Sequence, residues 1–506
     1  MKILYIPIDE RPCNYQYPLR AVHSIENIQV ESPTIDLLGE KKKPADTVKL
    51  WNFIFDNIED GDILILSTET MMYGGLIPSR LHHFDQTDKL VFLNKLKKVK
   101  SKYPNITIFL SNMIMRTPQY NSSDEEPDYY EHNGLNIFNL GVLLDKGARG
   151  ELDQTASDEV ISLKRKIGEN DLNDFVTRRK FNKDLTLELI ELVENGVIDF
   201  MVIPQDDSHQ YGFTAMDQSV IYPKIREKGL SQCILVYPGA DEVGYELLAR
   251  GINQINNSTP KIYVTYSSVN GPSIVPTFED REIAESLKSH VLVTGSRLTC
   301  DINEADFVLA YNTPGKKMME SSMQLTHRDL SFDRNRNIPY FVEEITDICK
   351  KKIPIAICDK SFSNGGDLQL LELLSNRPRL WSNILSYRGW NTNCNALGSA
   401  LAEGIFGLFN NQNLRNENLF LTLCDDLFYQ PIIRGEIAQN YLSKWDLTYF
   451  DLKDKQSLVI DKTYELLTQC WEKYFSNLDV PITVDEIKVL FPWNRMFEVY
   501  VGKKNA

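Results

Sequence analysis

The sequence predicts an α/β fold built on parallel strands, and three observations indicate it. Short apolar or β-branched runs recur along the 506 residues, most of them separated by stretches with the apolar spacing of helices. The runs are almost continuously apolar, as in strands that are covered on both faces. Polar segments rich in carboxylates follow nearly every run. We expect a (β/α)8-like, TIM-type barrel, with an open doubly wound parallel sheet as the alternative.

Nine of the runs are expected to be strands. They cover residues 2–8, 62–68, 106–112, 200–205, 233–238, 261–266, 306–311, 353–358 and 383–387. Helical patterns lie between them, among others at 44–57, 88–102, 240–252 and 367–374. Polar chemistry is spread over at least seven strand ends, which favours a closed barrel, because an open sheet concentrates its site at one switch point.

Two longer helical stretches stand apart from this alternation. The stretch at 140–195 is typical of an insertion, and the stretch at 430–475 is typical of a helical C-terminal region. We therefore expect a barrel-like catalytic domain over residues 1–435 that contains the insertion. Residues 436–506 are expected to form a small helical region that packs on the barrel.

The composition is that of a globular protein with an acidic balance. Lysine and arginine number 55 against 70 aspartates and glutamates, which gives a net charge of -15. This balance argues against nucleic-acid and anionic-membrane partners, because both require positive charge. No apolar run reaches the roughly 18 residues of a membrane helix, and the N-terminal segment turns acidic too soon for a signal peptide. Eight scattered cysteines suit a reducing compartment, so we expect a cytoplasmic protein.

Asp206 and Asp207 are the strongest candidates for catalysis. Two adjacent carboxylates at the end of a buried strand repel each other and lose water, so one is expected to keep its proton near neutral pH. That residue can act as a general acid while its charged neighbour orients the substrate. Neighbouring strand residues point to opposite faces, so the pair shares a site only if the chain leaves the sheet there. The structural alternative is one catalytic aspartate beside a helix cap or an ion-pair partner.

A second acidic pair, Asp241 and Glu242, follows the fifth expected strand. One of the two is a further catalytic candidate, but Asp241 can instead cap the helix expected near Val243, with Glu242 complementing its dipole. Substrate contacts are expected from polar residues near the strand ends, namely Asp9, Arg11, Glu69, Tyr73, Arg80, Arg116, Gln205, His209, Asp359, Asn364, Asp367, Trp390, Asn391 and Asn393.

Three of these residues, Trp390, Asn391 and Asn393, have the chemistry of a sugar platform. An aromatic face stacks on the C–H face of a pyranose, and amides hydrogen-bond its hydroxyls. The alternative is a tryptophan that simply packs against its neighbours at the mouth of the barrel. Aromatic residues make up 10% of the chain, and many stand beside strand ends, which favours a carbohydrate substrate.

The sequence lacks the common cofactor motifs. Neither G-x-G-x-x-G with the right acidic residue downstream nor G-x-x-x-x-G-K-[ST] follows a strand, so no nucleotide cofactor is expected. The seven histidines form no H-E-x-x-H or H-x-H pattern, which disfavours zinc. We expect no cofactor and no metal ligands. A hard divalent ion on Asp206, Asp207, Asp241 and Asp359 is left open as an alternative.

Six motifs together resemble a known family. They are D-E-R-P (9–12), Y-G-G-L (73–76), Q-D-D-S (205–208), G-A-D-E (239–242), S-N-G-G-D (363–367) and G-W-N-T (389–392). In this order they resemble a bacterial family of similar length that is catalogued only as a domain of unknown function. The resemblance extends from residue 1 to about 435, and Glu10 departs from the family's usual D-D-R-P. It implies a shared polar rim and supplies no mechanism.

The adjacent aspartates also resemble those of barrel N-acetylhexosaminidases, in which the acetamido group of the substrate is the nucleophile. This resemblance implies that Asp206 orients the acetamido group, Asp207 protonates the leaving oxygen, and Tyr311 or Tyr387 holds the acetamido oxygen. We expect a glycoside hydrolase that releases a terminal N-acetylhexosamine or related hexose from a small glycan.

Two alternatives to this function are left open. One is a metal-dependent phosphoester or amide hydrolase, in which the carboxylates bind the ion. The other is a non-catalytic sugar- or nucleotide-binding protein. In each case the expected partner is a small molecule or an oligosaccharide, with no nucleic acid and no membrane, and the sequence leaves a homo-oligomer open.

Overall fold

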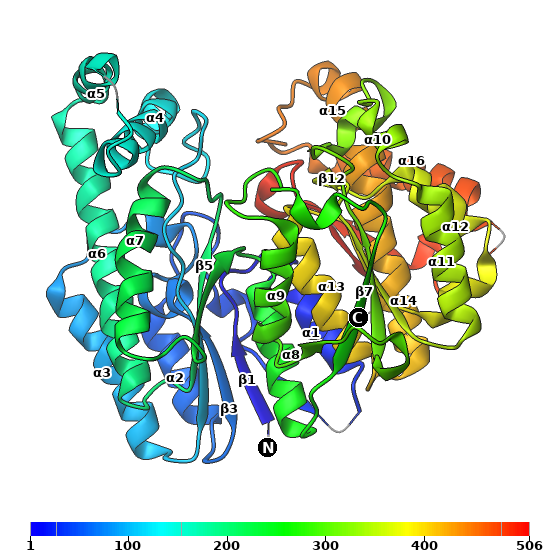
Figure 1. Cartoon of the computed structure of the whole chain (residues 1–506), viewed down its shortest axis with the longest axis horizontal. Coiled ribbons are helices and arrows are strands. Elements are labelled where there is room, and N and C mark those ends of the chain that lie inside the picture. The colour runs from blue at the N-terminus through cyan, green and yellow to red at the C-terminus, as the bar shows by residue number, and fades with distance from the viewer. Residues whose placement is uncertain (1, 27, 153, 477, 505–506) are drawn as a thin grey trace. The chain divides into compact units, whose positions relative to one another are not determined.

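The computed structural model describes residues 2–26, 28–152, 154–476 and 478–504, which are divided between two compact units (Figure 1). Unit 1 consists of Met1–Glu10, Gln29–Gly244 and Phe278–Asp280, and unit 2 consists of Arg11–Ile28, Tyr245–Thr277 and Arg281–Ala506. The predicted division at residue 435 is therefore not the division that the structure shows, because residues 436–506 belong to the same unit as the second half of the chain.

Unit 1 contains an open sheet of six strands, and every pair of neighbours is parallel. In spatial order the strands are β2 (Gln29–Glu31), β1 (Lys2–Ile6), β3 (Ile63–Ser67), β4 (Thr107–Ser111), β5 (Phe200–Gln205) and β6 (Ile234–Pro238). Every residue of β3 and β5 is buried, as expected for a sheet covered on both faces. The chain passes from β1 outward to β2 and then back to β3, so the strand order reverses between β1 and β3.

Helices connect these strands. They are α2 (Thr47–Asn57), α3 (Gln86–Lys102), α4 (Tyr130–Ala148), α5 (Gln154–Ile167), α6 (Glu169–Glu194) and α7 (Phe213–Glu227). Helices α4 to α6 occupy the stretch where a helical insertion is predicted, and they pack on one another. Helix α8 (Val243–Ile255) begins at the end of unit 1 and continues into unit 2.

Unit 2 contains a second open parallel sheet with the same kind of strand order. In spatial order its strands are β13 (Ile384–Arg388), β11 (Ile355–Asp359), β9 (Phe307–Asn312), β7 (Lys261–Tyr266) and β8 (Arg297–Leu298). The chain again passes outward, from β7 to β8, and then returns to β9. The strand order of this sheet therefore reverses between β7 and β9, as it does between β1 and β3 in unit 1.

The remaining elements of unit 2 surround this sheet. They are α1 (Gln16–His23), α9 (Ile283–Val293), α10 (Ser331–Arg334), α11 (Ile338–Lys350), α12 (Leu368–Ser375), α13 (Asn393–Gly407), α14 (Gln412–Leu423), α15 (Arg434–Asn440), α16 (Gln456–Phe475), the parallel pair β10 (Met319–Glu320) with β12 (Phe362–Ser363), and the antiparallel pair β14 (Ile487–Leu490) with β15 (Tyr500–Lys503). Helix α13 packs closely on β9 and β11 because it has Gly404 there: a Cβ at this position would lie 2.9 Å from Phe307 and 3.1 Å from Ala356.

The C-terminal residues are part of the hydrophobic core of unit 2. Val459 and Leu467 of α16 and Val489 of β14 belong to the same buried cluster as Val308 of β9 and Ile357 of β11. This continuity explains why residues 436–506 do not form a separate region.

The closed barrel of the leading prediction is not what the structure shows. Within the described residues the parallel strands form two open sheets, and the alternative prediction of an open parallel sheet fits this arrangement. Polar segments follow at least seven strands because two sheets each have a carboxyl edge of their own. The spread of polar residues therefore did not require a closed barrel.

Candidate functional site

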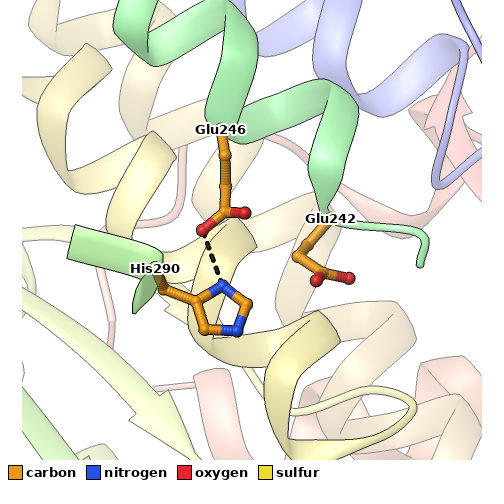
Figure 2. A group of neighbouring side chains, drawn as sticks. All are labelled: Glu242, Glu246 and His290. Atoms are coloured by element: carbon orange, nitrogen blue, oxygen red, sulfur yellow. Dashed lines mark hydrogen bonds and ion pairs between the residues drawn. The ribbon is translucent and has the colours of Figure 1, made fainter. Parts of the chain in front are cut away.

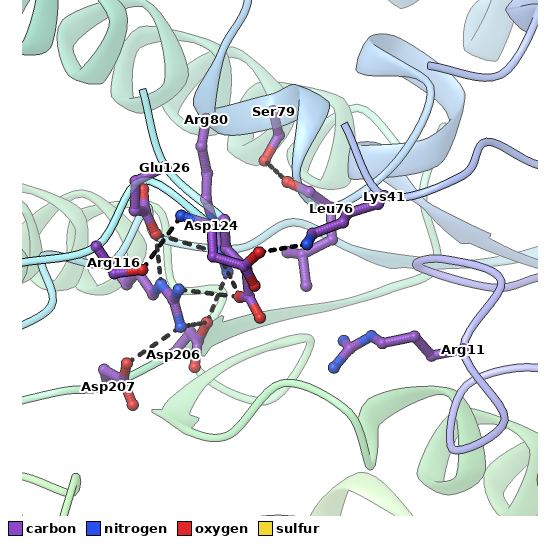
Figure 3. A network of polar contacts seen from close by, with 12 residues as sticks. Arg11, Lys41, Leu76, Ser79, Arg80, Arg116, Asp124, Glu126, Asp206 and Asp207 are labelled. Carbon is purple, nitrogen blue, oxygen red and sulfur yellow. Dashed lines mark hydrogen bonds and ion pairs between the residues drawn. The ribbon is translucent and has the colours of Figure 1, made fainter. Parts of the chain in front are cut away.

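The candidate site of unit 1 is a cluster of two arginines and four carboxylates beyond the carboxyl ends of β3, β4 and β5 (Figure 3). The arginine–carboxylate cluster consists of Arg80, Arg116, Glu125, Glu126, Asp206 and Asp207. Arg80 ends a short helix after β3, Arg116 follows β4, and the two aspartates follow β5. Ligands of open parallel sheets bind at this edge, so the cluster lies where the fold favours a site.

The two arginines connect the acidic side chains. Arg80 contacts Asp206 at 2.8 Å and Glu126 at 3.2 Å. Arg116 contacts Glu126 at 2.7 Å, Asp207 at 3.2 Å and Asp206 at 3.6 Å. Glu125 lies 3.0 Å from Arg116 and 3.2 Å from Arg80. Figure 3 shows Glu126 on one side of Arg116 and the two aspartates on the other.

Asp206 and Asp207 share this site because the chain leaves the sheet between them. Strand β5 ends at Gln205, and Asp207 has a φ of 45°, in the left-handed region. Aspartate tolerates this conformation better than most residues, but it is still strained, and such strain is concentrated at functional sites. Both carboxylates thereby reach the same nitrogen of Arg116.

The cluster is partly open to solvent. The side chains of Arg80, Arg116 and Glu126 are 3%, 8% and 4% exposed, whereas those of Asp206 and Asp207 are 18% and 15% exposed. Glu125 is also 18% exposed. The two arginines and Glu126 are thus buried, and the two aspartates and Glu125 are the part that solvent can reach.

The protonation of Asp207 differs from that of an ordinary aspartate. Burial raises the pKa of Asp207 to about 7, and the negative charge of Asp206 adds to the rise. Arg116 and Arg80 act in the opposite direction without cancelling it. At neutral pH, Asp207 therefore exists as a mixture of carboxylic acid and carboxylate, which suits a group that donates and accepts protons.

Glu69 and Tyr73 lie in a turn of π-helix, Glu69–Tyr73, that follows β3. Glu69 accepts hydrogen bonds from Ser67 (2.8 Å) and from the backbone of Met113 (2.7 Å), and burial raises its pKa. The Tyr73 hydroxyl donates to Asn182 at 2.9 Å. These residues and Arg80 line a cavity of about 10 Å³, which is close to the smallest volume that holds a water molecule.

The other predicted residues of unit 1 are buried or half-buried, and Asp9 belongs to the buried ones. The side-chain oxygen of Gln205 accepts a hydrogen bond from Gln218. The ring of half-buried His209 lies edge-on to that of Phe138, with ring centroids 5.0 Å apart. Burial lowers the pKa of His209.

Asp241 and Glu242 stand immediately before α8, and both are buried. Glu242 accepts a hydrogen bond from the backbone of Ala240 at 2.9 Å, so its carboxylate turns back onto the preceding chain.

In unit 2, the predicted residues Asp359 and Asp367 form a buried network with Asn312, Arg336 and Tyr387. Asp359 accepts hydrogen bonds from Asn312 (2.8 Å), from the backbone of Asp367 (2.7 Å) and from Tyr387. Asp367 contacts Arg336 at 2.7 Å and caps α12. Burial raises the pKa of Asp359 to about 6. Neither aspartate is exposed to solvent, so in this conformation both have a structural role.

The predicted sugar platform is also largely buried. Asn393 is unexposed, and its side chain accepts a hydrogen bond from Tyr311 at 2.6 Å. The carbonyl group of Asn391 accepts a hydrogen bond from the buried ammonium of Lys360 at 2.8 Å. Trp390 is half-buried, with its ring 5.9 Å from that of Phe497.

Two further predicted residues of unit 2 bind other parts of the same unit. Arg11 contacts Glu498 at 3.4 Å and lies over the ring of Trp493. The Asn364 side chain donates to Glu320 at 2.6 Å. All seven predicted residues of unit 2 therefore lie in a different compact unit from the arginine–carboxylate cluster.

Sequence reasoning missed Glu125 and Glu126, which complete the cluster. They belong to the acidic run 124–126 in the loop between β4 and α4, away from any strand end. Three consecutive acidic residues a few positions after Arg116 were a signal that could have been used, because buried arginines require nearby carboxylates. Lys41 pairs with Asp124 of the same run.

Unit 2 also contains a fully buried pair formed by Glu246 and His290. The ring nitrogen Nδ1 of His290 lies 2.7 Å from the Glu246 carboxylate, and neither side chain is exposed (Figure 2). Imidazole and carboxylate are both ligands of divalent metal ions, so this pair has the chemistry of two metal ligands. The contact is well explained as a structural hydrogen bond.

Comparisons with known proteins place the chain in one family. No helix within the described residues is long and apolar enough to span a membrane. No curated protein matches the chain. A family model described as "Protein of unknown function (DUF4127)" matches residues 3–502, which is almost the full length. The predicted resemblance is thereby confirmed, and the chain belongs to the DUF4127 family of proteins of unknown function.

Proposed function

We propose that this protein is a glycoside hydrolase in which Asp207 is the general acid and Asp206 stabilises the reacting sugar. The observation that carries the proposal is the solvent-reachable acidic pair at the carboxyl edge of unit 1, with one pKa raised to about 7. A general acid needs a pKa near the pH at which it works, and a carboxylic acid reaches this value beside a second carboxylate.

A second aspartate pair shows why exposure matters. Burial and the charge of Asp426 raise the pKa of Asp425 to about 7 as well. Asp425 accepts hydrogen bonds from Tyr17 (3.0 Å) and Gln430 (2.8 Å), and the two aspartates are only 3% and 1% exposed. A substrate cannot reach them, so the raised pKa alone does not indicate catalysis. The partly exposed pair, Asp206 and Asp207, is the better candidate.

The proposed reaction uses the two aspartates in different ways. Asp207 donates its proton to the glycosidic oxygen as the bond to the sugar breaks, and it regains a proton when water attacks. Asp206 stabilises the positive charge that develops on the sugar or on its acetamido group. Arg80 and Arg116 hold the Asp206 carboxylate in place at 2.8 and 3.6 Å.

The proposed substrate is a small glycan with a terminal N-acetylhexosamine or related hexose. The roles that the resemblance to N-acetylhexosaminidases implied for Tyr311 and Tyr387 are not part of this proposal. Both tyrosines are buried in unit 2, where their hydroxyls already donate to Asn393 and Asp359. The residue that holds an acetamido oxygen is thus left unassigned.

Hydrolysis of a panel of nitrophenyl glycosides tests this function. The panel contains α and β anomers, with and without 2-acetamido groups, and each reaction is run with and without EDTA. Wild type is compared with Asp206→Asn and Asp207→Asn, which keep the side-chain shape and remove the acid. Asp128→Asn is the matched control, because Asp128 is fully exposed in the same unit.

The proposal predicts EDTA-resistant hydrolysis of at least one glycoside, lost by about a hundredfold or more in both cluster variants and unchanged in Asp128→Asn. Hydrolysis that EDTA abolishes would instead indicate a metal-dependent hydrolase. Silence of the folded wild-type protein across the panel would overturn the proposal for these sugars.

A further inference from the structure

We propose that unit 2 contains a binding site for a neutral sugar in the cleft at the carboxyl end of β7. The cleft has a volume of about 800 Å³ and is lined by residues 266–270 and 332–341 together with Glu344 and Gln369. Ligand sites for small molecules have volumes of roughly 300–1,000 Å³. The inference goes beyond the proposed hydrolysis, because it requires no chemistry at Asp207.

The position of the cleft in the fold is the first argument. The strand order of unit 2 reverses between β7 and β9, and the cleft is lined by Tyr266, the last residue of β7, and by the loop that follows it. In open parallel sheets, ligands bind outside the carboxyl ends of the strands at such a reversal. The fold therefore favours a ligand at this place in unit 2.

The second argument is a set of oriented amide groups with unused donors. The Asn337 oxygen caps α11 by accepting from the backbone of Tyr340 at 3.0 Å, and the Gln369 oxygen accepts from Arg328 at 2.7 Å. Among the described residues, neither amide nitrogen has a hydrogen-bond partner. Each amide is thus held by its oxygen and has two N–H donors left for a ligand.

Two tyrosines supply aromatic surface beside these amides. Tyr266 is half-buried and stacks on Tyr311, with ring centroids 5.7 Å apart, which fixes its orientation. Tyr340, in the first turn of α11, is 68% exposed. Aromatic rings and amide donors are the combination that binds the C–H face and the hydroxyls of a sugar. This is the chemistry that the sequence predicted for Trp390 and Asn393, but in the structure it occurs at a different place.

The charges of the cleft favour a neutral ligand over a phosphate. Arg336 lines the cleft, but its guanidinium is unexposed and bound to Asp367 (2.7 Å) and Asn312 (3.2 Å). The other lining arginine, Arg334, is exposed, and the lining also contains two carboxylates, Asp333 and Glu344, of which Asp333 is paired with Arg328 at 3.0 Å. Phosphate sites use cations whose charge is available to the ligand, and the charge of Arg336 is already paired with Asp367, although its second terminal nitrogen has no hydrogen-bond partner among the described residues.

Isothermal titration of the full-length protein with methyl glycosides tests the site. The probes are the methyl α- and β-glycosides of glucose, galactose, mannose, N-acetylglucosamine and N-acetylgalactosamine, with inorganic phosphate and adenosine monophosphate as alternative ligands. The background is Asp207→Asn, so that hydrolysis does not obscure the heats, and wild type is titrated in parallel.

Two variants remove the donors and keep the fold. Asn337→Asp with Gln369→Glu retains both accepting oxygens. Tyr266→Phe retains the stack on Tyr311 and removes a hydroxyl that, among the described residues, has no hydrogen-bond partner and is therefore a further donor for a sugar. The matched control is Gln412→Glu with Asn413→Asp, which adds the same charge at an exposed helix start elsewhere in unit 2.

If the cleft binds a sugar, at least one methyl glycoside should bind wild type and Asp207→Asn with the same affinity. Its affinity falls about tenfold or more in the double cleft variant and about fivefold in Tyr266→Phe, and it is unchanged in the control. Binding that Asp207→Asn abolishes and the cleft variants leave intact would overturn this inference while supporting the proposed hydrolase. No glycoside binding, or binding of phosphate or nucleotide only, would also overturn it. Cleft binding without any glycosidase activity would overturn only the proposed hydrolase.

Discussion

The carboxylate of Asp207 lies 3.2 Å from the guanidinium of Arg116, yet its pKa is raised to about 7. A nearby cation alone would lower the pKa of an aspartate by one to three units. Here burial and the negative charge of Asp206 outweigh the arginine. The cluster thus keeps Asp207 partly protonated near neutral pH beside a second acidic side chain, which is the arrangement that acid catalysis by adjacent aspartates requires.

Arg116→Gln is expected to raise the pKa of Asp207 further. Arg116 lowers that pKa, so its removal eliminates a favourable charge for the carboxylate form. We expect a rise of about one unit or more, measured as a shift of the upper limb of the pH–activity profile to higher pH. Arg149→Gln, which removes an arginine paired with Asp145 outside the cluster, is the control and should leave the profile unchanged. A shift to lower pH would contradict this account.

The stability of the protein should depend on Asp207 between about pH 4 and 7. The pKa of Asp207 rises from 3.8 to about 7 on folding, so in this range the folded state binds more protons than the unfolded state. The stabilising contribution is complete at low pH and is lost as the pH rises through 7.

Asp207→Asn should therefore remove part of the loss of stability between pH 5 and 8, by up to a few kcal/mol relative to wild type. Urea unfolding at the two pH values measures the difference. Asp425 and Asp359 contribute in the same direction and remain in the variant, so the wild-type trend should be reduced and not abolished. An equal loss in variant and wild type would show that the pKa of Asp207 is not raised.

Glu126→Gln is expected to destabilise the protein by about 3 kcal/mol. The Glu126 carboxylate is 4% exposed and contacts Arg80 at 3.2 Å and Arg116 at 2.7 Å. Neutralising it leaves two buried cations less well compensated, and breaking a buried ion pair costs about 3–5 kcal/mol. Thermal and urea unfolding measure the effect, with exposed Asp128→Asn as the control. A loss below about 0.5 kcal/mol would mean that the other carboxylates suffice for both arginines.

The sequence predicted the longer strands of the two parallel sheets well, because each of them is a mostly apolar run bounded by turn residues. All nine expected runs contain a strand, from β1 at Lys2–Ile6 to β13 at Ile384–Arg388. Strands β2, β8, β10 and β12 were not predicted because, with two or three residues each, they are too short to show a pattern. The four-residue strands β14 and β15 were not predicted either. The local sequence pattern also does not show whether β6 and β7 pair with each other. That long-range pairing is what distinguishes one closed barrel from two open sheets.

The site was predicted in part for a similar reason. Asp206, Asp207, Arg80 and Arg116 were recognised from their places near strand ends, and the structure brings them together. Asp359 and Asn393 occupy equivalent places in the sequence, but they are buried and bound to tyrosine hydroxyls. The sequence shows which strand ends carry polar residues. Their exposure depends on the loops that pack over them, which local pattern does not reveal.

The most direct test of the central claim compares two leaving groups in Asp207→Asn. A general acid assists the departure of a poor leaving group strongly and of a good one hardly at all. For a sugar whose glycosides the wild type hydrolyses, kcat/KM should fall about a hundredfold or more when the leaving group is an unactivated alcohol, as in a methyl glycoside or a disaccharide, and less than about tenfold when it is 2,4-dinitrophenol. Equal losses with both leaving groups, in a variant that melts like the wild type, would contradict the assignment of Asp207 as the acid.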